Sequence, residues 1–222
     1  MKAARYLIFS FDDGVEDDRR LVQLLNQYGF KATFFLNGLF DEHSAAFEDE
    51  GAVVFHLPHD QLPSLYQGHE VAVHSWSHPN LTSLPKDLVI DELKRSRDWI
   101  SILFGIVPVG VAYPFGSSDK KTAEIVKELG FRYARTIDKA PDFSISRDPY
   151  LHHPTAHFLT KDFDKLLNDF LSTPLEDQSL ILHFWGHSYE LTGHDQWDWF
   201  EQKLIQIKKH KNIINISLKE LF

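Results

Sequence analysis

Residues 6–14 read Tyr-Leu-Ile-Phe-Ser-Phe-Asp-Asp-Gly, an apolar run that leads directly into two adjacent carboxylates. A second apolar run at residues 71–73 leads in the same way into His74, and His78 follows four residues later. One carboxylate with two imidazoles is a donor set for a catalytic metal that keeps one position open for water. The spare carboxylate can then act as a base toward that water. The two stretches together predict metal-assisted hydrolysis.

Short apolar runs alternate with segments of helical periodicity along the whole chain. This alternation indicates an α/β fold of parallel strands with crossover helices, in which the chemistry gathers at the carboxyl ends of the strands. The expected strands lie at residues 5–11, 32–36, 70–73, 109–112, 133–137, 179–184 and 212–216. The expected helices lie at residues 16–28, 86–104, 119–129, 161–171 and 196–210.

The length of 222 residues suits one α/β domain spanning residues 1–222, interrupted by an irregular insertion at about residues 41–68. The net charge of −9 and the lack of any Lys/Arg cluster disfavour a nucleic-acid or anionic-membrane partner. The longest apolar runs are too short to cross a bilayer, so no integral membrane contact is expected. No secretory signal is visible, which predicts a cytoplasmic protein, although a trimmed export signal would look the same. The absence of cysteine excludes disulfides and thiolate metal sites.

Each motif also has a plainer interpretation. Asp-Asp-Gly after a strand is ordinary turn chemistry. Histidine pairs at the same spacing recur at positions 153/157 and 183/187, so the spacing alone does not select His74 and His78. The context does, because only this pair follows a strand end in a Gly-His-Glu-Val-Ala-Val-His frame.

Four motifs in order resemble the polysaccharide deacetylases, the NodB-homology enzymes of carbohydrate esterase family 4. They are Ser-Phe-Asp-Asp-Gly at 10–14, Gly-His-Glu-Val-Ala-Val-His-Ser-Trp-Ser-His-Pro-Asn-Leu at 68–81, Tyr-Pro-Phe-Gly at 113–116 and a strand that ends Leu-Ile-Leu-His at 180–183. The resemblance covers most of the chain and implies a distorted (β/α)7 barrel of the glycoside hydrolase/deacetylase type.

The resemblance also implies a role for each matching residue and a divalent metal cofactor. Zinc suits the donor set best, and Co2+, Ni2+, Mn2+ or Fe2+ would also fit it. The implied residues are Asp12 as general base, Asp13, His74 and His78 as metal ligands, the backbone N–H of Phe115 as oxyanion donor and His183 as general acid.

The chain departs from the family pattern at the start of the third motif. An arginine that braces the base is usual there, and this chain has Ala112. Arg135 ends the next predicted strand, and our hypothesis is that it reaches back to brace Asp12. The alternative is that Arg135 forms a surface ion pair with Asp138 or Asp142.

A second departure follows the predicted acid, where the chain continues Phe-Trp-Gly-His-Ser-Tyr-Glu. His187 or Tyr189 could line the substrate pocket, or His187 could compete with His183 as the acid. We favour His183 because it directly follows the apolar run at residues 180–182.

Aromatic residues inside the motifs are candidates for binding a sugar ring. Trp76, Tyr113 and Trp185 are predicted to contact the substrate, together with His187. The alternative for the tryptophans is packing in the core.

The sequence therefore predicts a metal-dependent hydrolase that removes acetyl groups from an N- or O-acetylated sugar or oligosaccharide. One alternative is hydrolysis of a non-sugar C–N bond, such as a cyclic ureide, on the same scaffold. Another is a non-catalytic glycan-binding domain, which would be expected to lack Asp12 or His183, and both are present.

Overall fold

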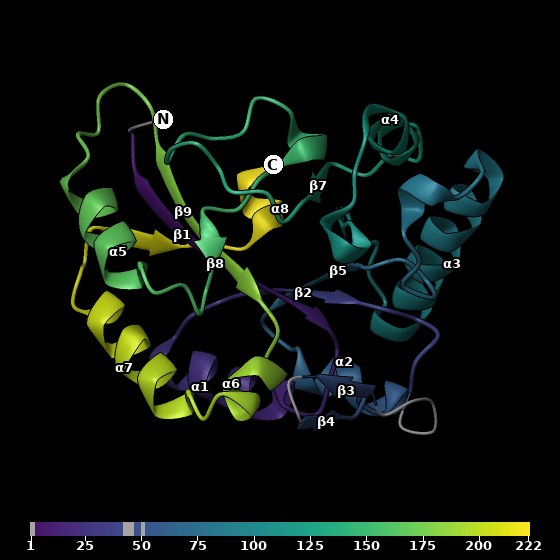
Figure 1. Ribbon diagram of the computed structural model, residues 1–222, viewed down its shortest axis with the longest axis horizontal. Coiled ribbons are helices and arrows are strands. Elements are labelled where there is room, and N and C mark those ends of the chain that lie inside the picture. The colour runs from purple at the N-terminus through teal and green to yellow at the C-terminus, as the bar shows by residue number, and fades with distance from the viewer. Residues whose placement is uncertain (1–2, 42–46, 50–51) are drawn as a thin grey trace.

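A curled parallel sheet forms the centre of the computed structural model, which describes residues 3–41, 47–49 and 52–222. The described strands follow the order β7-β6-β5-β2-β1-β9-β8, and β10 pairs with β1 beside this path (Figure 1). The strands are β1 (Arg5–Asp13), β2 (Thr33–Leu36), β5 (Glu70–Val73), β6 (Gly110–Ala112), β7 (Tyr133–Arg135), β8 (Ala156–His157), β9 (Leu180–Gly186) and β10 (Ile213–Asn215).

Helices surround the sheet, with α1, α6 and α7 below it, α3 and α4 to the right and α5 to the left in Figure 1. None of the helices in the described part of the chain is long and apolar enough to cross a membrane. The α-helices are α1 (Asp18–Tyr28), α2 (Leu62–Leu65), α3 (Lys86–Phe104), α4 (Lys120–Glu128), α5 (Phe163–Ser172), α6 (Tyr189–Gly193), α7 (Trp197–Lys208) and α8 (Leu218–Leu221). Short 3-10 turns are η1 (His59–Gln61), η2 (Leu81–Ser83), η3 (Pro114–Gly116) and η4 (Pro149–Leu151).

Strand β1 shows why this sequence folds as the centre of a covered sheet. Leu7, Phe9 and Phe11 belong to a large buried cluster that includes side chains of α1 and α7. Ile8 belongs to a separate, smaller cluster together with Phe35 of β2. Because side chains alternate between the two faces of a strand, the nearly continuous apolar run of β1, broken only by Ser10, is typical of a strand buried on both faces.

The segment between β7 and β9 connects the two ends of the sheet path. His152 forms a parallel bridge with Arg135 of β7, and its backbone N–H donates to Ala134 O at 2.9 Å. A few residues later, β8 pairs with β9 through His157 and Trp185. The distorted parallel barrel that the sequence predicted is therefore confirmed. This segment contacts β7 on one side and β9 on the other.

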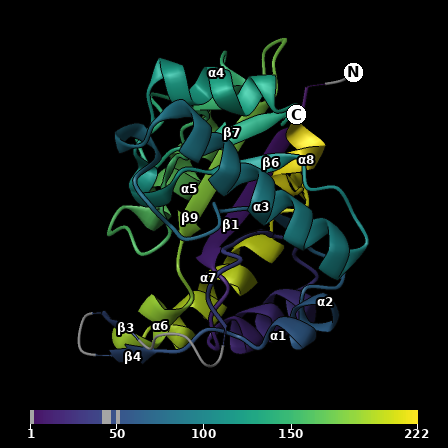
Figure 2. The ribbon, with the colours of Figure 1, turned by 90° about the vertical axis from the view of Figure 1, so that its right-hand side faces the viewer.

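The expected strands all occur, but some bounds differ from the prediction, and β7 ends at Arg135, two residues before the predicted end. Strand β8 was not predicted, and β9 continues to Gly186, two residues beyond the predicted end. The predicted insertion is also less irregular than expected. Its described part holds the antiparallel hairpin β3 (Phe47–Asp49) and β4 (Ala52–Val54), followed by η1 and α2. The hairpin lies against α6 (Figure 2). Residues 42–46 and 50–51 of the insertion lie outside the described residues.

Candidate active site

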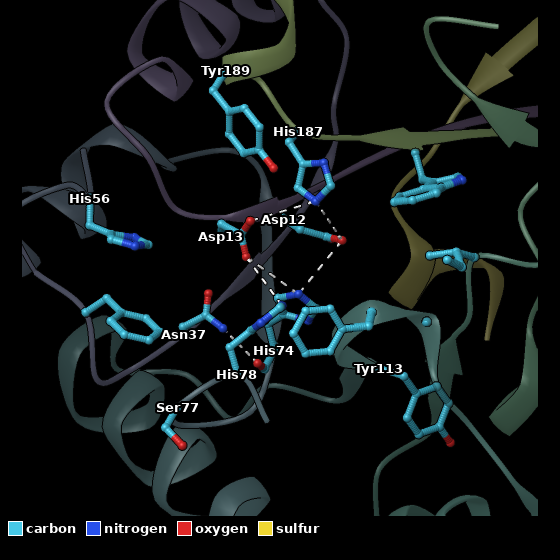
Figure 3. A pocket seen from close by; sticks show the side chains of 15 residues that line it. Asp12, Asp13, Asn37, His56, His74, Ser77, His78, Tyr113, His187 and Tyr189 are labelled. Atoms are coloured by element: carbon cyan, nitrogen blue, oxygen red, sulfur yellow. Dashed lines mark hydrogen bonds and ion pairs between the residues drawn. The ribbon is translucent and has the colours of Figure 1, made fainter. Parts of the chain in front are cut away.

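A pocket of about 480 Å³ lies where the carboxyl ends of β1, β2, β5 and β9 meet (Figure 3). Five of the ionisable side chains singled out from the sequence line it together. They are Asp12, Asp13, His74, His78 and His187. Parallel strands bring their carboxyl ends to one side of a barrel, so motifs far apart in the chain converge there.

Asp13, His74 and His78 form the predicted metal-ligand cluster. Asp13 Oδ1 lies 3.7 Å from His74 Nε2 and 3.9 Å from His78 Nε2. One donor atom from each residue lies within 4.8 Å of the other two, close enough for all three to bind one ion.

The protonation of the two imidazoles also suits a metal. His74 Nδ1 lies 2.9 Å from the carbonyl oxygen of Ala112, so this nitrogen donates, and in the neutral ring Nε2 presents a lone pair to the cluster. Burial, aided by the neighbouring His74 ring, lowers the pKa of His78 to about 4, despite the opposing effect of Asp13. His78 is therefore neutral at pH 7, as a metal ligand must be.

The turns that carry this cluster have an uncommon backbone conformation. Asp13, Ser75, His78 and Phe115 have φ values of 82°, 62°, 55° and 58°, in the left-handed region that residues other than glycine rarely adopt. Such conformations persist only where the surroundings enforce them, and they concentrate at functional sites.

Hydrogen bonds from helix α3 hold the turn between the two histidines. Glu92 Oε2 accepts from the backbone N–H groups of Trp76 and Ser77 at 2.9 and 2.8 Å, and Oε1 accepts from the Ser77 hydroxyl at 2.7 Å. Ser75 Oγ accepts from the backbone N–H of His78 at 3.0 Å. These contacts provide hydrogen-bond acceptors for the backbone N–H groups of the turn that follows β5. They also fix the orientation of His78.

Asp12 forms a buried ion pair with Arg135, as the hypothesis of a relocated arginine predicted. Arg135 Nη2 donates to Asp12 Oδ1 at 2.6 Å and also contacts Oδ2. The side chains are 0% and 3% exposed, so the alternative of a surface pair between Arg135 and Asp138 or Asp142 is wrong. Burial alone would raise the pKa of Asp12, but Arg135, His74 and His187 together lower it. Asp12 is therefore ionised at neutral pH.

His183 does not line the pocket. It pairs in register with Ile8 inside the sheet, and its side chain is fully buried. Both ring nitrogens have partners, since Nε2 lies 2.9 Å from Ser10 Oγ and Nδ1 lies 2.9 Å from His152 Nε2. Burial, reinforced by His152 and Arg135, lowers the pKa of His183 well below its usual range. The structure therefore places His183 outside the pocket, where the sequence did not expect it. The predicted strand end was too early, and β9 continues past this residue.

His187 occupies the position that His183 was expected to fill. It follows the end of β9 directly, and Figure 3 shows it opposite His74, across Asp12 and Asp13. Its Nε2 lies 4.0 Å from Asp12 Oδ2 and 3.8 Å from Asp13 Oδ2. Its Nδ1 lies 3.3 Å from Glu190 Oε1, an ion-pair contact that is not aligned as a hydrogen bond.

The charges around His187 favour its protonated form. Burial lowers the pKa of this imidazole, but Glu190, Asp13 and Asp12 more than offset burial and raise it to about 9. Sequence reasoning missed Glu190. A local signal was available, because Glu190 follows His187 by only three residues and lies in the first turn of α6.

The predicted substrate contacts divide into two groups. Tyr113, Trp185 and His187 line the pocket, whereas Trp76 does not. Trp76 instead packs beside α3, with the Arg95 guanidinium 4.6 Å from its ring centroid, and its role as a substrate contact stays a prediction.

Phe115 also lines the pocket, and 62% of its surface is exposed to solvent. Its ring centroid lies 4.5 Å from that of His78. The role of its backbone N–H stays a prediction. Asn37, Phe40 and His56 also line the pocket, and nothing in the motifs pointed to them.

The fold and the site together define a parallel-barrel protein with a candidate metal centre at the carboxyl ends of its strands. The family model described as polysaccharide deacetylase matches residues 2–134, and the chain belongs to this family. The match contains Asp12 and the three metal-ligand candidates and ends before Arg135 and His187.

Curated relatives show the same similarity over part of their length. Chitin deacetylase 1 of Cryptococcus neoformans is 27% identical over 122 residues, which are 54% of this chain and 23% of the relative. Peptidoglycan-N-acetylglucosamine deacetylase PgdA of Listeria monocytogenes is 27% identical over 125 residues, which are 55% of this chain and 24% of the relative. The match thus spans about a quarter of each relative.

The fold is shared with solved structures along nearly the whole chain. A family 4 acetyl xylan esterase from Clostridium thermocellum, in complex with a cobalt ion, superimposes with a TM-score of 0.58. The alignment covers 98% of this chain and 90% of the esterase at 16% identity. At 16% identity, this similarity establishes the fold alone.

Proposed function

We propose that this chain is a metal-dependent deacetylase that hydrolyses the acetamido group of N-acetylated sugar units. The observation that carries the proposal is the pairing of Asp12 and His187 beside the metal-ligand cluster in one pocket, with 4.0 Å between Asp12 Oδ2 and His187 Nε2. The substrate class is supported by the relatives, which bear the names chitin deacetylase and peptidoglycan-N-acetylglucosamine deacetylase.

Asp13, His74 and His78 are the residues that would hold the cation. Two imidazole nitrogens and one carboxylate suit Zn2+, and Co2+, Ni2+, Mn2+ and Fe2+ accept the same donors. A divalent cation bound there supplies Lewis acidity, which lowers the pKa of water and polarises a carbonyl group.

Asp12 is the candidate base, because it is ionised and lies beside the cluster without belonging to it. It would accept a proton from the water that attacks the acetyl carbon. Arg135 holds the carboxylate in one orientation through contacts to both of its oxygens. The arginine therefore positions the base and keeps it charged.

His187 is the candidate acid, in place of His183. Its pKa of about 9 keeps it protonated at neutral pH, while its Nε2 faces the base. It would donate this proton to the leaving nitrogen, since an amide nitrogen that departs without one would leave as an unstable anion. The backbone N–H of Phe115 would donate to the oxyanion, a contact typically worth about 3 kcal/mol.

Acetate release from chitooligosaccharides and from peptidoglycan fragments tests the proposal. With zinc added, Asp12→Asn and His187→Gln should each lower kcat by roughly 10²- to 10⁴-fold. His183→Gln is the matched control, because it changes a buried histidine outside the pocket. A chelator should abolish the parent activity. Activity that survives both chelation and Asp12→Asn would reject the mechanism. If His187→Gln stays active and a folded His183→Gln does not, the acid role returns to His183.

A further inference from the structure

Three polar side chains in successive contact lead away from the pocket. His187 lines the pocket, and its Nδ1 lies 3.3 Å from Glu190 Oε1. The other oxygen of Glu190, Oε2, lies 3.0 Å from Nε2 of His157, a residue that does not line the pocket. One donor atom from each of these three residues also lies within 4.8 Å of the other two. This arrangement fits two interpretations, a second metal site and a series of hydrogen-bonded side chains.

The hydrogen bonding of His157 separates these two interpretations. The backbone N–H of Leu159 donates to Nδ1 of His157 at 3.3 Å. A ring nitrogen that accepts a hydrogen bond carries no proton, so in the neutral ring the proton is on Nε2, which faces Glu190. A metal ion would need the lone pair of Nε2 instead. The local geometry therefore favours a hydrogen bond from His157 to Glu190 over a shared cation.

Packing fixes the His157 ring in this orientation. His157 belongs to β8 and pairs with Trp185 of β9, and the two rings meet edge to face with their centroids 4.9 Å apart. The close approach also depends on Gly186, because a Cβ there would lie only 2.8 Å from Nε2 of His157. Trp185 thus packs against this imidazole, and Gly186 leaves the space that it occupies.

Glu190 is held on one side and presents its other oxygen to the acid. Its Oε2 receives the contact from His157 and also accepts from the backbone N–H of His187 at 2.9 Å. Rotation about the last bond of a glutamate side chain is otherwise broad. With Oε2 anchored by two donors, Oε1 is directed at Nδ1 of His187.

We propose that His157 is a positioning residue for the proton donor. By anchoring Glu190 it keeps His187 oriented with Nε2 toward the reacting nitrogen. This inference rests on the proposed function, in which His187 is the acid. It goes beyond that function by extending the catalytic machinery to a residue on another strand that does not touch the substrate.

The proposal predicts a dependence on the leaving group. An amide nitrogen must be protonated as it departs, so its release depends on a well-oriented acid. The p-nitrophenolate ion is stable enough to leave from p-nitrophenyl acetate without a proton. Weakening the orientation of His187 should therefore slow N-deacetylation much more than hydrolysis of the aryl acetate.

The test compares His157→Ala and His157→Gln in the zinc-loaded enzyme, with chitotetraose and p-nitrophenyl acetate as substrates. His157→Ala should lower kcat on the amide roughly tenfold with KM nearly unchanged, and it should leave aryl acetate hydrolysis close to the parent rate. His157→Gln should recover most of the loss, because the glutamine amide can still donate to Glu190. His210→Ala, at the end of α7 and away from the pocket, controls for the loss of an imidazole.

Equal losses on the two substrates would show a general structural effect and overturn the proposal. So would a folded His157→Gln variant as slow on the amide as His157→Ala. A second equivalent of zinc, bound by the parent and lost in His157→Ala, would establish the metal interpretation instead. If the parent releases no acetate from the oligosaccharide, the proposed function itself fails, which is a separate outcome.

Discussion

Replacing Arg135 with methionine should both destabilise the fold and suppress the activity, because it leaves Asp12 buried without its counter-charge. The pair is almost completely removed from solvent, with Arg135 0% and Asp12 3% exposed. The guanidinium also lies between two aromatic rings, 5.2 Å from the centroid of Phe35 and 5.1 Å from that of Trp185. Methionine is apolar and fills much of the same space, so the main loss is electrostatic.

Breaking a buried ion pair by removing one partner costs about 3–5 kcal/mol, because the remaining charge is left uncompensated. This is a large part of the roughly 5–15 kcal/mol that stabilises a typical domain. Removing both charges is much less costly, since an apolar or neutral replacement of a buried pair is often nearly neutral. The double variant Asp12→Asn/Arg135→Met should therefore recover most of the stability that Arg135→Met loses.

The assay is urea denaturation followed by tryptophan fluorescence, with chelator present so that no cation contributes. Acetate release with zinc present is measured in parallel. At neutral pH Arg135→Met should lose roughly 10²-fold or more in kcat, because without the guanidinium burial raises the pKa of the Asp12 base. The double variant should be stable and inactive.

Two results would refute this reasoning. If Arg135→Met lowers the free energy of unfolding by less than about 1 kcal/mol, the buried pair contributes no more than a weak surface ion pair does. A double variant no more stable than Arg135→Met would show that the loss comes from packing and not from the unpaired charge.

Two further predictions concern stability. Burial raises the pKa of Asp18 to about 7, so the unfolded chain gives up this proton first as the pH rises. The free energy of unfolding should therefore fall by about 3 kcal/mol between pH 4 and pH 7, and Asp18→Asn should lack that loss in urea titrations at both pH values. Gly110→Ala should lower the melting temperature, with a cost of about 1–3 kcal/mol, because the added Cβ would lie 2.0 Å from Cζ of Tyr133; an unchanged melting curve would show that Tyr133 moves freely.

The parts of the site that follow strand ends could be predicted from the sequence. Asp12, Asp13 and His74 each come at the end of a largely apolar strand, and parallel strands bring such ends together. The contact between Arg135 and Asp12 was predictable for the same reason, although β7 and β1 are not neighbours in the sheet.

The histidine that faces the pocket could not be chosen correctly, because the choice depended on where β9 ends. Phe184, Trp185 and Gly186 continue the strand, so His183 lies four residues before the strand-end histidine, about 13 Å along an extended chain. A fully buried strand and the loop after it have similar composition here, and periodicity does not mark the boundary.

The position of Trp76 depended on a long-range contact that no local pattern reveals. Glu92 of α3 binds the backbone of residues 76 and 77 and thereby holds this turn against the helix. Tryptophan in a catalytic motif is typical of sugar stacking and of core packing alike, and the sequence does not show that this turn is held against α3.

Calorimetric titration of the metal-free protein with Zn2+ tests the central claim most directly. The account predicts one site per chain, lost in Asp13→Ala and in His78→Ala and retained in Glu190→Gln, which changes the second cluster of possible ligands. Binding that is unchanged in Asp13→Ala, or that is lost only in Glu190→Gln, would contradict it.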